Sequence, residues 1–265
     1  MATPLELLVW NGEQRALHPH RDTEPPAELA VADSWLVEDG RARALDLHFD
    51  RFSRSCTQHA GAAPAEVAAF LTAVREALPA RGRWFPRIEL TGGAGAQLQL
   101  ALRLRPAPPP GGPARLWVYE GPDPRAHPRI KGPDLHLLAA VREGAVRAGC
   151  DEALLLGPDG ELREGAYSSV LWWHGDVLCA PPAEAQVLPG VTRQLLLDLA
   201  RAEGRTVRLA PARLGDLDGA EVWITSALHG IRPVAGRIAA GADPAPAHRF
   251  AAWNARLAAL ARPVR

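Results

Sequence analysis

Short runs in which hydrophobic and polar residues alternate predict β-strands along much of the chain. The run QLQLALRLRP has leucine at every second position from 98 to 104, so one face of this strand is apolar. The run LELLVWNG ends in Asn11-Gly12, a pair that favours a tight turn. Further strands are predicted in FPRIELTGG, in ARLWVYE and in EVWITSALHGIRPV, the last of which runs into a loop.

Apolar residues spaced three and four positions apart predict helices between these strands. The segment AEVAAFLTAVREAL has this spacing and is bounded by Pro64 and Pro79. Another helix is predicted near residues 47–60, and VTRQLLLDLARAEG predicts a helix that ends at Gly204. The remaining helices are expected in LHLLAAVREGAVRAGC and AHRFAAWNARLAALA.

Hairpins are predicted around Asp39-Gly40, at residues 158–160 and around Gly175-Asp176, each with turn-forming residues between apolar runs. This mixture of hairpins and helices favours an α+β fold. The segment GPDPRAHP, residues 121–128, has three prolines and is typical of a linker. We therefore predict a small N-terminal α+β domain over residues 1–120, a linker over 121–130 and a larger C-terminal α+β domain over 131–265.

Composition and charge narrow the class of partners. The chain has a formal net charge of zero, which gives no indication of nucleic acid or an anionic membrane as a partner. It has no apolar run of the roughly 20 residues needed to cross a bilayer, and its first residues do not resemble a signal peptide. We therefore expect a cytoplasmic protein. Its three cysteines are far apart, so we expect reduced thiols and no metal site.

Lys131 is the single lysine of the chain, although lysine and arginine together number 30. Arginine replaces lysine wherever only a positive charge is needed. It cannot do so where the chemistry needs an amine that loses its proton, because arginine stays protonated and a desolvated lysine can attack a carbonyl. The alternative is that Lys131 is a remnant of compositional drift. The other motifs of the chain decide between these interpretations.

Three further stretches could hold an aldehyde cofactor that carries a phosphate. Glu164, in LREGAYSS, could keep a pyridine nitrogen protonated, which makes the ring an electron sink. Thr192, in LPGVTRQLLLDLA, starts a helix, and free N–H groups at a helix N-terminus favour a phosphate. The stretch ITSALHGIRPV adds hydroxyl and N–H groups after a strand. Taken alone, Glu164 is better explained as a solvated turn residue and Thr192 as an ordinary N-cap.

In chain order the sequence shows H-x-x-R at 48–51, the lysine at 131, E-G-x-x-S at 164–168, L-P-G-V-T-R at 188–193 and T-S-A-L-H-G-I-R-P-V at 225–234. This set resembles the class IV aminotransferase family, the fold-type IV enzymes that use pyridoxal 5'-phosphate. The family includes branched-chain and D-amino-acid aminotransferases and aminodeoxychorismate lyase. The resemblance extends from about residue 5 to 235.

The resemblance implies a role for each matching residue. Lys131 would be the catalytic residue, forming a Schiff base with the cofactor and moving the proton at the substrate Cα. Glu164 would pair with the pyridine nitrogen. The resemblance also implies a homodimer with the cofactor in a cleft between the two domains. The cofactor-binding residues would be Arg51, Lys131, Glu164, Ser168, Ser169, Val191, Thr192, Ser226 and Ala227.

Departures from the family pattern fall where substrate would bind. Ser169 stands where the family usually has the asparagine of E-G-x-x-S-N. The common F-E-T of the N-terminal hairpin is not matched in the stretch that contains Trp35, and the common T-R-G is Thr91-Gly92-Gly93 here. We take Trp35 and His229 as candidate substrate contacts, with core packing and a structural hydrogen bond as the alternatives. Trp172 and Trp173 alternate on a strand, so one is expected in the core and the other at a domain or dimer contact.

The cofactor motifs do not select one reaction, because the bound cofactor stabilises a carbanion in all of them. We favour a pyridoxal-phosphate aminotransferase acting on a small-molecule amino acid. A lyase of the aminodeoxychorismate type, which releases pyruvate from an amino-cyclohexadiene substrate, is the alternative. The stretch A-L-H-G-I-R-P-V favours it, and the missing T-R-G argues against a standard carboxylate clamp in either enzyme. A non-catalytic cofactor-binding homologue is a second alternative, against which the retained lysine argues. The sequence does not name the amino donor, the acceptor or the stereochemistry at Cα.

Overall fold

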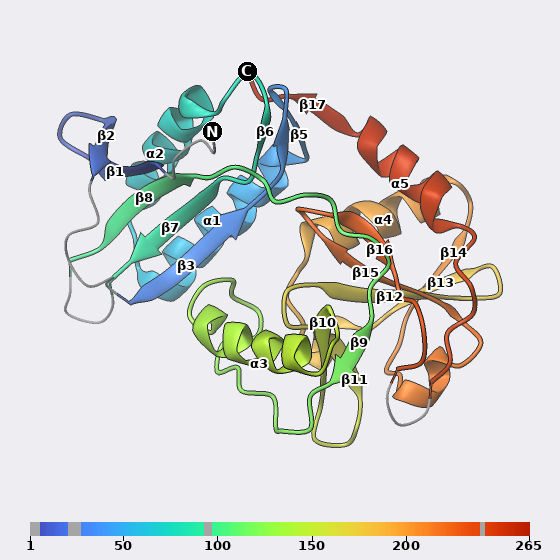
Figure 1. Ribbon diagram of the computed structural model, residues 1–265. Helices are drawn as coiled ribbons and strands as arrows, with labels where there is room; N and C mark the ends of the chain where they lie inside the picture. Colours follow the sequence, from blue (N-terminus) through green and yellow to red (C-terminus); the bar gives the residue numbers. More distant parts are fainter. Residues whose placement is uncertain (1–5, 21–27, 93–96, 239–241) are drawn as a thin grey trace. The chain divides into compact units, whose positions relative to one another are not determined.

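The computed structural model of the chain describes residues 6–20, 28–92, 97–238 and 242–265, which form two compact units (Figure 1). The first unit comprises Met1–Pro109, Ile130–Pro133 and Leu260–Arg265. The second comprises Pro110–Arg129 and Asp134–Ala259. Residues 121–129 of the predicted linker are thus part of the second unit, and Lys131 is part of the first.

The first unit contains an antiparallel five-stranded sheet in the order β2-β1-β8-β7-β3. The alternation predicted at residues 98–104 gives β8 one apolar face, and Leu102 is buried there together with Ile88 and Leu90 of the neighbouring β7. The strands are β1 (Glu6–Asn11), β2 (Ala16–His20), β3 (Leu29–Ser34), β7 (Arg87–Thr91) and β8 (Gln99–Leu104).

Helices α1 (Leu45–Ala60) and α2 (Pro64–Ala77) pack against this apolar face, and Figure 1 shows them on one side of the sheet. Phe52 and Phe70 are fully buried there. Gly61 ends α1 in the left-handed conformation and Pro64 begins α2, which are the favoured residues at these positions. Both predicted helices are confirmed.

A second, small sheet of the first unit has the order β17-β5-β4-β6. Its hairpin turns at Asp39-Gly40, where both residues have positive φ, 47° and 70°. A two-residue turn with this geometry matches the twist of the strands, so the predicted hairpin is confirmed. The strands are β4 (Val37–Glu38), β5 (Arg41–Arg43), β6 (Arg83–Trp84) and β17 (Ala261–Pro263).

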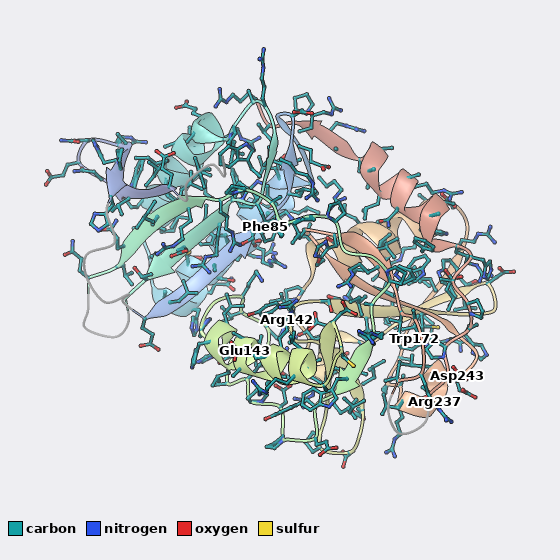
Figure 2. The ribbon with its side chains drawn as sticks, in the orientation of Figure 1. Phe85, Arg142, Glu143, Trp172, Arg237 and Asp243 are labelled. Atoms are coloured by element: carbon teal, nitrogen blue, oxygen red, sulfur yellow. The ribbon has the colours of Figure 1, made fainter. Side chains whose placement is uncertain are left out.

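The second unit has a five-stranded sheet in the order β14-β13-β12-β15-β16 and a three-stranded sheet in the order β11-β10-β9. Leu154 and Leu162 of the smaller sheet share a core with Trp172 and Val222 of the larger one; Trp172 is labelled in Figure 2. The predicted hairpins at 158–160 and 175–176 are confirmed. The strands are β9 (Leu116–Val118), β10 (Glu152–Leu156), β11 (Leu162–Gly165), β12 (Ser169–His174), β13 (Val177–Ala180), β14 (Thr206–Leu209), β15 (Glu221–Ser226) and β16 (Gly230–Pro233).

The helices of the second unit are α3 (Leu135–Arg147), α4 (Val191–Ala202) and α5 (Phe250–Ala259), with short 3-10 turns at Ala183–Ala185 and Leu214–Leu217. Trp173 and Trp223 point away from the shared core and pack on Trp253 of α5, with ring centroids 5.2 and 5.9 Å from it. Trp173 is therefore internal to this unit, and the expected domain or dimer contact is wrong. Among the described residues, no helix is both long and apolar enough to cross a bilayer.

The stretch after β15 differs from the prediction of a loop. Gly230, with φ of 66°, completes a tight turn, and Gly230–Pro233 returns as β16 alongside β15. Ile231 and Val234 are buried in this return, which supplies the driving force for pairing. The thiols of Cys56, Cys150 and Cys179 are free, as predicted.

Candidate active site

Lys131 lies beside the edge strand of the first unit. The Ala32 N–H group in β3 donates a hydrogen bond to the Lys131 carbonyl oxygen at 2.6 Å. Gly132 has φ of 147°, and a Cβ atom there would lie 2.7 Å from Val31 Cα. Only glycine tolerates both this backbone angle and this approach. Gly132 therefore sets how closely the lysine segment lies against β3.

Arg51, in α1, belongs to a buried cluster around Asp33 of the same strand, β3. Asp33, fully buried in β3, accepts hydrogen bonds from Arg51 Nε and Nη2, both at 2.8 Å, and its Oδ1 lies 2.8 Å from His48 Nδ1. Burial opposes ionisation of Asp33, but the Arg51 guanidinium and His48 hold the pKa of this carboxyl well below its usual range. The two-point contact fixes the plane of the guanidinium.

His48 connects this cluster to the lysine. Burial lowers the pKa of His48, and the positive charges of Arg51 and Lys131 lower it further against the opposing effect of Asp33. His48 is therefore neutral at pH 7. The Lys131 carbonyl is hydrogen-bonded to Ala32 and Arg51 is hydrogen-bonded to the adjacent Asp33, so the structure places these two predicted site residues along the same strand.

Asp33 was missed at the sequence level. The sequence comparison considered the stretch that begins at Ser34 and did not include Asp33. The available signal was a carboxylate inside the buried run LAVADSW, since a fully buried carboxylate needs partners.

Glu164 is the centre of the second unit's site. It is the penultimate residue of β11 and is buried, and its Oε1 accepts a hydrogen bond from Leu188 N–H at 2.8 Å. Arg125 Nη1 also contacts this oxygen. Within the described part of the chain, Oε2 accepts no hydrogen bond. Burial raises the pKa of Glu164 to about 7, although Arg125 and the Leu188 N–H group favour the charged form.

The serine pair after Glu164 joins this strand to two other motifs. Ser169 pairs with Thr225 in the register of β12 and β15. A Cβ atom on Gly190 would lie 2.6 Å from Ser169 Oγ, so L-P-G-V-T-R packs directly on this serine. Ser168 Oγ donates instead to the buried carboxylate of Glu152 at 3.0 Å. Ser168 therefore shapes the loop, and Ser169 faces the turn before α4.

The N-terminus of α4 faces the same region. Gly190 is the N-cap residue and makes no side-chain cap, so Thr192 lies inside the first turn and not at the cap. The first intrahelical hydrogen bond runs from Gln194 N–H to Gly190 O. The N–H groups of Val191 and Thr192 precede it and have no intrahelical acceptor, which suits an anion.

Ser226 and Ala227 follow at the end of β15. Ser226 Oγ accepts a hydrogen bond from His229 N–H at 3.2 Å, and His229 Nδ1 accepts one from Gly111 N–H at 3.3 Å. The structural hydrogen bond that was the alternative to a substrate contact of His229 is thus present. Trp35, in contrast, is 1% exposed and packs edge-on against Phe49 with ring centroids 5.4 Å apart. The structure places Trp35 in the core of the first unit and not at a pocket wall.

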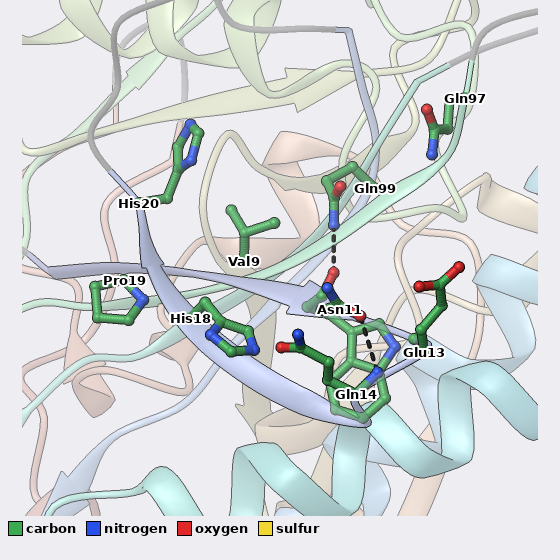
Figure 3. Close-up of a pocket in the computed structure, with 11 residues that line it drawn as sticks. Val9, Asn11, Glu13, Gln14, His18, Pro19, His20, Gln97 and Gln99 are labelled. Atoms are coloured by element: carbon green, nitrogen blue, oxygen red, sulfur yellow. Dashed lines mark hydrogen bonds between the residues drawn. The ribbon is translucent and has the colours of Figure 1, made fainter.

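The described residues also include a pocket at the β1–β2 hairpin (Figure 3). It has a volume of about 670 Å³ and is lined mainly by polar side chains such as His18, His20 and Gln97. Gln99 Nε2 donates to Trp10 O at 2.9 Å on its wall. None of the predicted site residues lines it. Across the described ranges, no group of three or more His, Cys, Asp or Glu side chains could hold a metal ion.

Comparison with known proteins identifies the class to which these motifs belong. The family model of class IV aminotransferases matches residues 30–236. The chain therefore belongs to this family, whose cofactor is pyridoxal 5'-phosphate.

Individual relatives match over shorter stretches. A mitochondrial branched-chain-amino-acid aminotransferase of Rattus norvegicus is 44% identical over 71 residues, which is 24% of this chain and 18% of the rat protein. A bifunctional aminodeoxychorismate lyase and D-amino acid transaminase of Mycobacterium tuberculosis is 32% identical over 97 residues, 34% of each chain. The matched segments thus span about a third or less of these relatives.

The whole fold is matched by a solved structure. The branched-chain aminotransferase of Thermoproteus uzoniensis, determined with norvaline, superposes with a TM-score of 0.82 at 17% identity. The match covers 98% of this chain and 100% of that one. The described fold is therefore that of the fold-type IV enzymes, as predicted.

The donor set of the second unit fits the cofactor of the family. A pyridinium ring needs a buried carboxylate with an oxygen to spare, and Glu164 Oε2 meets this need. A phosphate needs N–H donors, which the first turn of α4 presents. Arg193 Nε, in the same turn, is buried and has no hydrogen-bond partner among the described residues. Charge and donors thus agree with pyridoxal 5'-phosphate.

Proposed function

We propose that this chain is a pyridoxal-phosphate-dependent aminotransferase that acts on an amino acid, with Lys131 as its catalytic residue. Family membership supports the reaction class, and the chemistry of the single lysine supports the assignment of Lys131. The cofactor, when bound, supplies an electron sink for the substrate carbon that carries the amino group.

The chain's own residues have separate tasks in this proposal. Lys131 Nζ binds the cofactor and moves the proton at the substrate Cα. Glu164 Oε2 holds the proton on the pyridine nitrogen. Arg51, the N–H groups of Val191 and Thr192, and Ser226 with Ala227 bind the phosphate. Asp33 keeps the Arg51 guanidinium in one orientation through its two hydrogen bonds.

One observation carries the proposal. The buried Glu164 carboxylate accepts a hydrogen bond from Leu188 N–H, which joins the E-G-x-x-S motif to the L-P-G-V-T-R motif. Two segments separated by more than twenty residues therefore meet at a carboxylate and a helix N-terminus. The hydrogen bond uses Oε1 of Glu164 and leaves Oε2 available for the pyridine nitrogen.

A lyase of the aminodeoxychorismate type is the second candidate, since the mycobacterial relative carries both activities in its name. The same residues would release pyruvate from an amino-cyclohexadiene acid. The two reactions differ in whether a 2-oxo acid must be supplied as acceptor. Pyruvate formed without an acceptor selects the lyase, and amino transfer that depends on the acceptor selects the aminotransferase.

The test is a set of absorption spectra of the purified protein and of its Lys131→Arg variant with added cofactor. The parent is expected to show the visible band of the lysine-bound cofactor and to lose it when an amino acid donor is added. The variant is expected to show neither. A variant that keeps the band and the turnover would contradict the role of Lys131, and a parent that keeps the band with every donor would point to the non-catalytic homologue.

The proposal includes a homodimer, which the resemblance implies, and the cytoplasmic location and domain limits that the sequence predicts. Sedimentation of the purified protein tests the dimer, for which a mass of twice the 28.4 kDa of the chain is expected. A monomer that turns over substrate would contradict it.

A further inference from the structure

A buried ion network surrounds Glu164 in the second unit. Arg125 Nη1 contacts Glu164 Oε1, and the same guanidinium donates to Asp123 through Nε at 2.9 Å and through Nη2 at 2.7 Å. The Arg125 side chain is only 4% exposed and Asp123 only 5%. Ions removed from water to this extent must be held by their partners. The contacts are therefore part of the site's construction and not a surface pair.

Arg125 also touches a third segment of the chain. Its Nη2 donates to Gln186 O at 3.2 Å, and Gln186 has a positive φ of 57°. Two residues later, Leu188 N–H donates to Glu164. One guanidinium thus connects the proline-rich segment, the end of β11 and the turn that leads into α4.

Several charged groups near Glu164 act on the pKa of its carboxyl in opposite directions. Burial raises the pKa of Glu164 and the nearby Asp123 adds to this effect, while Arg125 opposes both. Arg193 is the other cation that interacts electrostatically with Glu164. Asp123 is in turn neutralised by Arg163 Nη1 at 2.6 Å. Arg125 alone hydrogen-bonds both carboxylates among these groups.

We propose that Arg125, fixed by Asp123, is a positioning residue that holds Glu164 in its charged form and leaves Oε2 for the cofactor. This inference rests on the proposed function, in which Glu164 holds the pyridine proton. It assigns a task to a segment whose proline content is typical of a linker. Arg125 acts through Glu164 and needs no contact with the cofactor.

Cofactor binding to the full chain tests the proposal. Apoprotein is titrated with pyridoxal 5'-phosphate between pH 6 and 9 for the parent, Arg125→Gln, Arg125→Lys and Arg163→Gln. Arg125→Gln is expected to weaken binding about fivefold at pH 7 and to move the pH midpoint of binding up by about one unit, since a one-unit rise from about 7 lowers the charged fraction of Glu164 from about one half to about one tenth. Arg125→Lys keeps the charge but not the two-point geometry and is expected to recover part of the loss.

Arg163→Gln is the matched control, because it removes the other guanidinium from Asp123 without touching Glu164. It is expected to stay within about twofold of the parent. A double-mutant cycle separates positioning from general damage. If Arg125 acts through Glu164, Arg125→Gln has no further effect on affinity in a Glu164→Gln background.

The outcomes are distinct. A parent that never binds the cofactor contradicts the proposed function itself. A parent that binds, with Arg125→Gln at parental affinity and pH midpoint, overturns only the role of Arg125, as do additive effects in the cycle. If Arg125→Gln does not fold, Arg125→Lys decides: weaker binding with a shifted midpoint supports the proposal, and parental binding overturns it.

Discussion

Asp33 is the residue on which the site of the first unit depends most. Replacing it with asparagine leaves Arg51 buried without its counter-charge, which typically costs about 3–5 kcal/mol. We expect Asp33→Asn to lower the free energy of unfolding by this amount in urea denaturation at pH 7. The folded pKa of Asp33 is lowered, so its stabilising contribution is present above its ordinary pKa and is lost as pH falls through the folded value.

Asp46→Asn is a suitable control for this change, because Asp46 is 82% exposed in its pair with Arg75. An exposed pair contributes at most about 1 kcal/mol. Equal losses of unfolding free energy in Asp33→Asn and Asp46→Asn would contradict the stabilising role of the buried Asp33 cluster.

The contribution of Glu164 to stability depends on pH in the opposite direction to that of Asp33. Its pKa is raised from 4.5 to about 7, so the folded apoprotein binds the proton more tightly than the unfolded chain. Protonated Glu164 contributes about 3 kcal/mol to the stability of the apoprotein. This contribution is fully present below pH 4.5 and is lost as the pH rises through 7. Relative to Glu164→Gln, the apoprotein should therefore lose stability between pH 4.5 and 8 in calorimetry. A constant difference between the two proteins would rule this out.

At the scale of elements, the segment Ile130–Pro133 is held against β3 by a close backbone approach at Gly132. Gly132→Ala adds a Cβ atom 2.7 Å from a backbone carbon that cannot rotate away. We expect the segment to shift, with a cofactor affinity reduced at least tenfold. Gly149→Ala is the matched control: its φ of 73° is also positive, but no atom lies within 4 Å of the added Cβ. It should cost about 1 kcal/mol of stability and leave cofactor affinity unchanged.

Elements whose signal is local were predictable. The Asp39-Gly40 hairpin needs only two residues that accept positive φ, and α2 needs only a first-turn proline and regular apolar spacing. The strand β16 was missed because its pairing with β15 depends on a turn of Ser226–Gly230 that resembles any glycine loop. Thr192 lies at the start of α4, as predicted, but the cap position itself is occupied by Gly190, so the alternative of an N-cap threonine is wrong.

At the scale of the whole molecule, contacts between segments that are distant in the chain could not be predicted from the sequence. The motifs that contain Glu164 and Leu188 were recognisable, but their hydrogen bond joins residues 24 positions apart. Arg125 gave no signal, since it lies among prolines that favour a linker, and its partner Glu164 is 39 positions away. Charged residues in such a segment show their role only when the fold brings a buried carboxylate to them.

The last prediction concerns cofactor binding by the whole chain. The proposed function gives Lys131 and Glu164 separate tasks toward the cofactor, one at its aldehyde and one at its pyridine nitrogen. A ligand present at 100 times its dissociation constant stabilises the native state by about 2.7 kcal/mol. We therefore expect pyridoxal 5'-phosphate to raise the unfolding temperature of the parent in a single transition, and Lys131→Met and Glu164→Gln each to reduce this rise. Should one of the two variants show the same rise as the parent, the task proposed for that residue would be wrong.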